Sequence, residues 1–186
     1  VQRSGERVHK RAPRAVDVAL PSVGLRGSGL TVYLGIDPGR NKSGWALVNA
    51  DGELCASGIF RTVDAPEFFR AAACGTFQSL ERFIIEKTAQ WPESWPEPQV
   101  LLGDGTGKEP LLALAQSATF RVKLVPEGGT TLEARSLYWR LHPPRGLWML
   151  VPTKLRVPRR DVDDLAAWAI VLRSLRKKQR EKERDW

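Results

Sequence analysis

An α/β fold built on a mixed sheet is the fold class that this sequence of 186 residues predicts. Three short segments rich in β-branched and aromatic residues follow one another from residue 31, and a tight turn at Asp51-Gly52 joins the second to the third. Strand-like and helical segments then alternate to the end of the chain. Apolar residues make up 42% of the sequence and charged residues 27%, which is the balance of a globular protein that buries a core.

The first half of the ordered region predicts an antiparallel meander followed by a helix. Strands are expected at 31–37, 43–49 and 53–62, where apolar runs are bounded by turn residues. Because a tight turn joins the last two strands, they must run antiparallel. The segment 64–67 combines an aspartate with a proline, as a helix start does, and we expect that helix to continue to about Thr88.

The second half predicts two further strands separated by helices. Strands are expected at 99–104 and 120–127, and helices at 108–118, at 130–142 and from about Asp161 into the charged tail. The expected architecture is therefore a five-stranded mixed sheet, a three-strand antiparallel meander plus two parallel strands, flanked by helices.

The net charge of +8 is concentrated at the two ends of the chain. Residues 1–30 carry a net charge of +4, residues 173–186 carry another +4, and residues 31–172 are neutral. The first segment is rich in Arg, Gly, Pro and Ser, so we expect a basic, disordered arm, then one folded domain and a charged helical tail. Basic ends attract nucleic-acid phosphates, and the equal alternative is that they only keep the protein in solution.

Cysteine usage and hydropathy exclude two classes of protein. The two cysteines, Cys55 and Cys74, form no CxxC pair and cannot build a disulfide scaffold, so a reduced, cytoplasmic compartment is expected. The longest apolar run, at 165–172, is far shorter than the roughly 20 residues that span a bilayer. A membrane protein and a disulfide-rich secreted domain are therefore excluded.

Three acidic residues follow strands that are expected to run parallel to one another. Asp37 ends the first strand, Asp104 the fourth and Glu127 the fifth. Carboxyl ends of parallel strands meet at one edge of an open α/β sheet, which is where such sheets bind ligands. Each acid also has a plainer interpretation, because carboxylates commonly cap turns and helix starts.

The last helix adds Asp161, Asp163 and Asp164 at its start. Its apolar stripe has the spacing i, i+3, i+4, i+7, and Asp161 and Asp164 continue that stripe toward the amino end, whereas Asp163 lies to one side. If the stripe packs on the sheet, Asp164 is the better placed of the neighbouring pair to share a site with Asp37. The alternative is that these acids only stabilise the helix dipole.

Acidic ligands without histidine suit Mg²⁺ or Mn²⁺ rather than zinc. Two such ions roughly 4 Å apart can activate water and stabilise the leaving oxygen of a phosphodiester. The predicted cofactor is therefore Mg²⁺ or Mn²⁺, as two ions, held by Asp37, Asp104, Glu127 and Asp164, with Asp161 and Asp163 as weaker candidates.

The segments GIDPGRNKSGWALV, LLGDGTG, VPEGGTTLEARSLYW, PPRG and VDDLAAWAI, in this order, resemble the YqgF family of the ribonuclease H-like superfamily, whose relatives include the RuvC Holliday-junction resolvases. The resemblance covers about residues 31–172. It implies a ribonuclease H-like fold and a divalent-metal nuclease acting in 16S ribosomal RNA maturation or junction cleavage.

The same resemblance implies roles for individual carboxylates. Asp37 matches the metal-bridging aspartate of the first strand, and Asp104 matches an acidic position of RuvC-type enzymes. Glu127 lies where the family has Asp-Glu, but Pro126 replaces the aspartate, so Glu127 serves alone or the site is weakened. Asp164 fits both the RuvC and the YqgF patterns of the last helix.

Basic and aromatic residues near these acids are candidates for binding the nucleic acid. Arg40, Lys42 and Lys108 could bind phosphate, and Arg135, Tyr138, Trp139 and Arg145 could provide cations and stacking surfaces for an unpaired strand. For the two aromatic residues the stronger alternative is a place in the core, since they lie on an amphipathic helix.

Three functions follow, in decreasing order of support. The first is a metal-dependent nuclease acting on RNA or branched DNA, as a monomer or a homodimer. The second is a nucleic-acid-binding module of the same fold with weakened catalysis, which Pro126 motivates. The third is an ATP-using enzyme of the actin and sugar-kinase type, whose two domains exceed what about 140 ordered residues provide.

Overall fold

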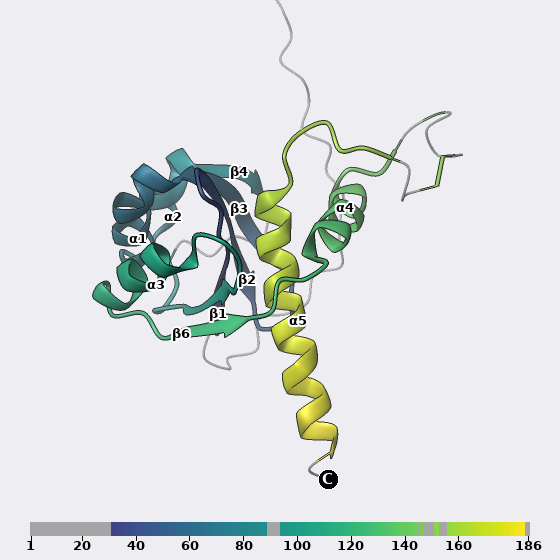
Figure 1. Cartoon of the computed structure of the whole chain (residues 1–186). Helices are drawn as coiled ribbons and strands as arrows, with labels where there is room; N and C mark the ends of the chain where they lie inside the picture. Colours follow the sequence, from purple (N-terminus) through teal and green to yellow (C-terminus); the bar gives the residue numbers. More distant parts are fainter. Residues whose placement is uncertain (1–30, 89–93, 145, 147–150, 153–155, 185–186) are drawn as a thin grey trace, which may run out of the picture.

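The computed structural model describes residues 31–88, 94–144, 146, 151–152 and 156–184. Over this part of the chain the protein forms one six-stranded mixed sheet with helices on both faces (Figure 1). The arm expected over residues 1–30 lies outside the described residues. No helix in the described part of the chain is long and apolar enough to cross a membrane.

The strand order across the sheet is β4-β3-β2-β1-β5-β6. Successive strands from β1 to β4 pair antiparallel, and β5 and β6 run parallel to β1 on its other side. All five expected strands are present. The bounds of the strands are β1 (Val32–Asp37), β2 (Lys42–Asn49), β3 (Leu54–Arg61), β4 (Ile84–Lys87), β5 (Gln99–Gly103) and β6 (Val122–Val125).

The expected count of five strands is wrong, because the segment after β3 does not stay helical to Thr88. A 3₁₀ turn, η1 (Thr62–Asp64), leads into α1 (Ala65–Ala73), which ends before Gly75 at a φ of 65°. Two short turns follow, α2 (Phe77–Leu80) and η2 (Glu81–Phe83), and then β4 pairs with β3 at the edge of the sheet. The indole Nε1 of Trp45 donates a hydrogen bond to the Phe83 carbonyl at 3.2 Å, which holds this segment against the sheet.

Two apolar cores lie on opposite faces of the sheet. Alternate residues of each strand face opposite sides, so that Leu34 and Trp45 pack with α1 and α3 (Lys108–Ser117), whereas Tyr33 and Ala46 pack with the other helices. Those helices are α4 (Thr130–Leu141) and α5 (Asp163–Arg184). The fold is therefore a three-layer arrangement with the sheet in the middle.

Helix α5 lies directly on the sheet because two strand glycines leave room for its backbone. A Cβ atom on Gly35 would overlap the Ala167 carbonyl, and one on Gly44 would overlap the Asp163 carbonyl. Gly44 pairs with Asp37 across β1 and β2. The close contact at Gly44 therefore brings the first residue of α5 to the end of β1.

Candidate functional site

The carboxyl ends of β1, β5 and β6 meet at one edge of the sheet, as parallel strands must. A cleft of about 540 Å³ lies at this edge. It is lined by the loop from Asp37 to Lys42, by the loop and first turn of α4 at 127–131, and by Asp163 of α5. Three segments that are far apart in the sequence thus contribute carboxylates to one cleft.

Asp37 is the most strongly perturbed acid of the cleft. Burial, together with the negative charges of Glu127 and Asp163, raises the pKa of its carboxyl to about 7. The Asp37 and Glu127 carboxyl groups also lie close enough to share a hydrogen bond when Asp37 is protonated. A carboxylate in this position gains stability from any cation that enters the cleft.

Glu127 lies beneath the glycine-rich loop that follows β5. A Cβ atom on Gly105 would overlap the Glu127 carboxylate, so a larger residue at this position would displace that carboxylate. Burial raises the pKa of Glu127, and the negative charge of Asp104 raises it too. When both Asp37 and Glu127 are ionised, the Oε2 atom of Glu127 is buried with no hydrogen-bond donor.

Asp104 lies beside Glu127, outside the lining of the cleft. Its Oδ1 atom accepts a hydrogen bond from the backbone N–H of Glu127 at 3.1 Å, and Lys108 donates to its backbone carbonyl at 3.0 Å. In this arrangement Asp104 fixes the position of Glu127 and adds negative charge next to it.

Lys42 bridges two acids at the start of α5. Its Nζ atom lies 2.9 Å from Asp163 Oδ2 and also forms an ion pair with Asp161. These hydrogen bonds, first to Asp161 and then to Asp163, raise the pKa of the Lys42 ammonium group. A cation therefore already neutralises one side of the cleft.

Asp164 is placed away from the cleft, which corrects the expectation that it shares a site with Asp37. Its side chain is fully buried, and its Oδ2 atom accepts a hydrogen bond from Ser57 Oγ at 2.7 Å. The Arg160 guanidinium donates to both Asp164 oxygens, at 2.7 and 3.1 Å. Asp163, which the apolar stripe had placed to one side, is the residue that lines the cleft.

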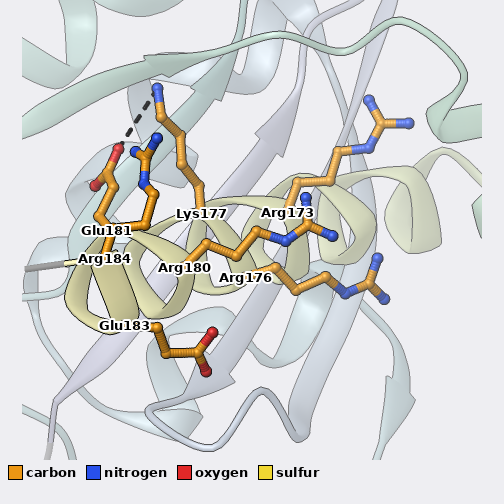
Figure 2. A pocket seen from close by; sticks show the side chains of 7 residues that line it. All are labelled: Arg173, Arg176, Lys177, Arg180, Glu181, Glu183 and Arg184. Carbon is orange, nitrogen blue, oxygen red and sulfur yellow. Dashed lines mark ion pairs between the residues drawn. The ribbon is translucent and has the colours of Figure 1, made fainter. Parts of the chain in front are cut away.

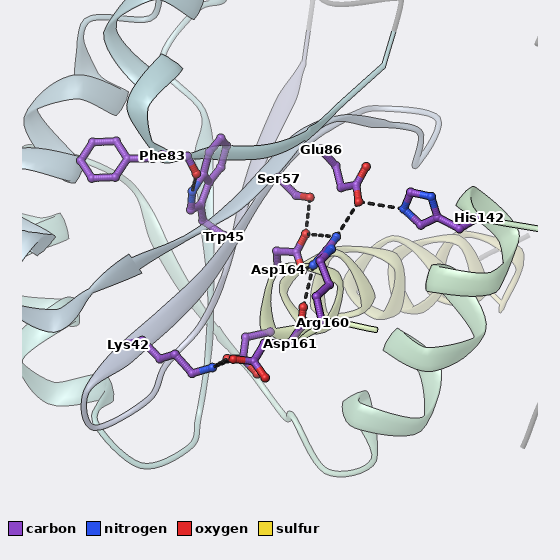
Figure 3. Close-up of polar contacts among 10 residues, drawn as sticks. Lys42, Trp45, Ser57, Phe83, Glu86, His142, Arg160, Asp161 and Asp164 are labelled. Atoms are coloured by element: carbon purple, nitrogen blue, oxygen red, sulfur yellow. Dashed lines mark hydrogen bonds and ion pairs between the residues drawn. The ribbon is translucent and has the colours of Figure 1, made fainter. Parts of the chain in front are cut away.

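The contacts of Asp164 are part of a larger network of polar side chains between the sheet and the helices α4 and α5 (Figure 3). Arg160 also pairs with Glu86 of β4 at 2.7 Å, and His142 at the end of α4 contacts the same Glu86 oxygen at 2.8 Å. This network was not predicted from the sequence. Its one signal there is that Arg160 and Asp164, which carry opposite charges, are only four residues apart, although Arg160 precedes α5 and helical spacing does not pair them.

Only some of the residues that were expected to bind phosphate line the cleft. Arg40 and Lys42 line it, whereas Lys108 lies at the start of α3 on the neighbouring loop. Arg135 is half-buried on α4, and Arg145 lies outside the described residues.

The expected stacking surface on α4 is largely closed. Tyr138 is only 7% exposed, and its ring packs edge-on against Trp139 with ring centroids 4.9 Å apart. The Trp139 indole is half-buried and donates to the Arg156 carbonyl at 3.4 Å. Tyr138 is therefore a core residue, and it is not accessible to a nucleic-acid base.

The donor set of the cleft fits a hard divalent cation. Asp37, Glu127 and Asp163 offer only carboxylate oxygens, one of them buried and without a donor, and Mg²⁺ and Mn²⁺ prefer such ligands. No group of three or more His, Cys, Asp or Glu side chains in the described residues already has the arrangement of a metal site. Lys42 holds the Asp163 carboxylate in an ion pair.

No protein-family model matches the chain, and no curated protein matches it.

Proposed function

We propose that this protein is a divalent-metal-dependent nuclease that hydrolyses phosphodiester bonds in structured nucleic acid, either precursor 16S ribosomal RNA or branched DNA. The observation that carries the proposal is the convergence of Asp37, Glu127 and Asp163 on one cleft. Carboxylates that repel one another, with raised pKa values and an oxygen lacking a donor, are an arrangement that a divalent cation stabilises.

The fold also supports a ribonuclease H-like assignment. That resemblance implies a sheet in which the first strand of an antiparallel meander lies between the second strand and two further strands that run parallel to the first. The order β3-β2-β1-β5-β6 agrees with it, and β4 extends the sheet at the meander edge.

The acidic and the basic residues of the cleft have different proposed roles. Mg²⁺ or Mn²⁺ ions bound by Asp37, Glu127 and Asp163 would activate a water molecule and stabilise the leaving oxygen. Asp37, whose pKa is about 7, would have to lose its proton to serve as a ligand. Lys42 and Arg40 line the same cleft and are placed to bind the phosphate that is cleaved.

A second candidate is a nucleic-acid-binding module of the same fold that turns over slowly or not at all. Two observations favour it. Pro126 stands where the family has an aspartate, and the Lys42 ammonium group occupies the space beside Asp163. This candidate predicts binding that needs no metal and little or no cleavage.

The decisive experiment compares cleavage by the parent chain and by Asp37→Asn. The substrates are a four-way DNA junction and a precursor 16S ribosomal RNA fragment, each with Mg²⁺ or Mn²⁺. We expect the parent to cut at least one substrate and Asp37→Asn to be slower by about 10³-fold, since several kcal/mol of charge stabilisation are lost.

The matched control is Asp51→Asn, which changes an exposed aspartate in the turn between β2 and β3. It should cleave at the parental rate. Cleavage that survives Asp37→Asn would refute the nuclease assignment, and metal-independent binding without any cleavage would favour the second candidate. A parallel titration with ATP tests the kinase-like alternative, which requires saturable nucleotide binding.

A further inference from the structure

The carboxyl-terminal half of α5 carries a stripe of cations on one side. Arg173, Arg176, Lys177, Arg180 and Arg184, here called the basic stripe, follow one another at intervals of three, one, three and four residues. Side chains at such intervals share one face of a helix. They surround a hollow of about 670 Å³ on the outside of α5, and Glu183 points away from most of them (Figure 2).

The basic stripe faces away from the sheet. Lys178, on the other side of the helix, points inward, with its Nζ atom 4.9 Å from the centre of the Tyr33 ring and 3.3 Å from Gln99 Oε1. The last buried residue of α5 is Ser174, Leu175 and Lys178 still contact the domain, and the helix then continues beyond these contacts to Arg184 (Figure 1). Packing against the domain does not explain this part of the helix.

Most of the charge on the basic stripe is uncompensated. Lys177 lies 3.9 Å from Glu181, and both side chains are largely exposed, so this pair is weak. In the described part of the chain no acidic side chain pairs with Arg176, Arg180 or Arg184. Cations held this close together repel one another, and a polyanion along the helix would remove that repulsion.

The basic stripe starts beside the loop that carries Glu127. Arg173 donates to the carbonyls of Pro126 and Gly128, at 3.3 and 2.7 Å, and pairs with Glu133 of α4 at 3.0 Å. These contacts tie α5 to the loop that carries Glu127. At a rise of 1.5 Å per residue, the stripe extends from about 15 to about 32 Å from Asp163 along the helix axis.

The chemistry of the basic stripe suits a phosphate backbone rather than bases. Residues 173–184 include no aromatic side chain, so this surface offers no platform on which an unpaired base could stack. Arginine and lysine bind phosphate oxygens without reading the sequence. A row of cations about 17 Å long therefore fits the regular backbone of a double helix.

We propose that the basic stripe binds the phosphate backbone of a duplex flank of the nucleic acid that the cleft receives. This inference rests on the proposed function for the identity of the ligand. At about 3.4 Å per base pair, the bound phosphates lie about four to nine base pairs from the cleaved bond. The protein thus requires a substrate with a double-stranded arm beside the cleavage site.

The test is a binding measurement on the full chain that needs no cleavage. The variant Arg176→Gln/Lys177→Gln/Arg180→Gln keeps good helix formers at all three positions and removes three charges. The probes are a labelled 20-base-pair RNA duplex and one of its strands alone, without divalent metal, at 50 to 200 mM salt. We expect the duplex affinity to fall by about tenfold or more, and the slope of log K against log salt to become shallower by about 2 to 3.

The matched control is Arg70→Gln/Arg82→Gln/Lys87→Gln, which removes three exposed cations from α1, η2 and β4. It should bind the duplex within about twofold of the parent at each salt concentration. Circular dichroism checks that α5 stays helical in both variants. Equal losses in the two variants, or a loss confined to the single strand, would overturn the proposal.

Two further probes separate other polyanions from nucleic acid. Vesicles with 30% phosphatidylserine and a polyglutamate chain are offered to the same proteins. Stripe-dependent binding of either probe without duplex binding would contradict the proposal. If Asp37-dependent cleavage occurs but the stripe variant binds normally, the stripe inference fails alone; if the stripe binds duplex but no cleavage occurs, the nuclease assignment fails alone.

Discussion

Two groups of carboxylates at the start of α5 differ in how their charge is balanced. In the cleft, Asp37 and Glu127 face each other beside Asp163. Burial raises both pKa values; the negative charges of Glu127 and Asp163 add to the rise at Asp37, and that of Asp104 adds to the rise at Glu127. On the other side of the helix start, Asp164 is fully buried but receives hydrogen bonds from Arg160 and Ser57. Carboxylates without a cationic partner are stabilised when a cation binds, whereas carboxylates that are already paired, such as Asp164, stabilise the fold.

The largest expected effect is a difference between substitutions of the neighbours Asp163 and Asp164, the first acting on the cleavage rate and the second on stability. Asp163→Asn should slow metal-dependent cleavage by about 10³-fold and change the free energy of unfolding by less than about 1 kcal/mol, because Asp163 pairs only with a partly exposed lysine. Asp164→Asn should lower the free energy of unfolding by about 3 kcal/mol, because it removes the fully buried carboxylate of an ion pair and leaves the half-buried Arg160 only partly paired. Cleavage assays and urea unfolding of both variants measure the two quantities.

Each of these two variants is the control for the other. Equal destabilisation by both, or loss of cleavage by Asp164→Asn under conditions where it is fully folded, would contradict the division between cleft and network.

The next effect is a pH dependence of stability in the metal-free protein. The pKa of Asp37 is about 7 in the folded state, against 3.8 for an ordinary aspartate. The folded state therefore holds a proton that the unfolded state has lost, and stability falls as the pH rises from about 4 to about 7 and stays low above it. The loss should amount to about 2 to 4 kcal/mol, allowing for partial exposure of the group.

Thermal unfolding at pH 4 to 8, with chelator, measures this dependence. Asp37→Asn should remove most of the fall, so that at pH 8 the metal-free variant is more stable than the parent. Adding Mg²⁺ at pH 8 should stabilise the parent and leave the variant unchanged. Parallel pH profiles for the two proteins would show that Asp37 is not perturbed in this way.

A smaller effect is expected from Glu86→Gln, which removes the more exposed of the two carboxylates that pair with Arg160. Glu86 is one of two carboxylates that bind Arg160, and its side chain is 20% exposed. The free energy of unfolding should fall by about 1 kcal/mol, as for a partly exposed ion pair. Urea unfolding measures it, with Glu81→Gln, an exposed residue of η2, as the control.

The smallest effect concerns Lys42, which competes with a metal ion for Asp163. Lys42→Met should tighten Mn²⁺ binding by about two- to fivefold, because an incoming ion no longer displaces an exposed ion pair worth less than about 1 kcal/mol. Isothermal titration calorimetry measures the affinity. Lys87→Met removes a cation outside the cleft and should leave the affinity unchanged; weaker binding by Lys42→Met would mean that Lys42 supports the site rather than competing for it.

Local patterns were sufficient to predict most of the fold. The strands that end at Asp37 and before Asp104 lie where their apolar runs indicated, and the expected helix at 130–142 corresponds to α4. The segment 84–87 falls within the helix that the start at 64–67 predicts, which was expected to continue to about Thr88. It becomes β4 only because the edge of β3 offers it backbone hydrogen bonds.

The sequence by itself determined the parallel strands, the acids at their carboxyl ends and the basic half of α5, because these depend on local periodicity and composition. Only the tertiary structure decided which aspartate of α5 enters the cleft and which is buried with Arg160. The rotation of α5 about its axis is fixed by backbone contact with Gly35 and Gly44 of the strands beneath it. A rotation of that kind is a property of two packed surfaces, and the spacing of residues along one of them does not contain it.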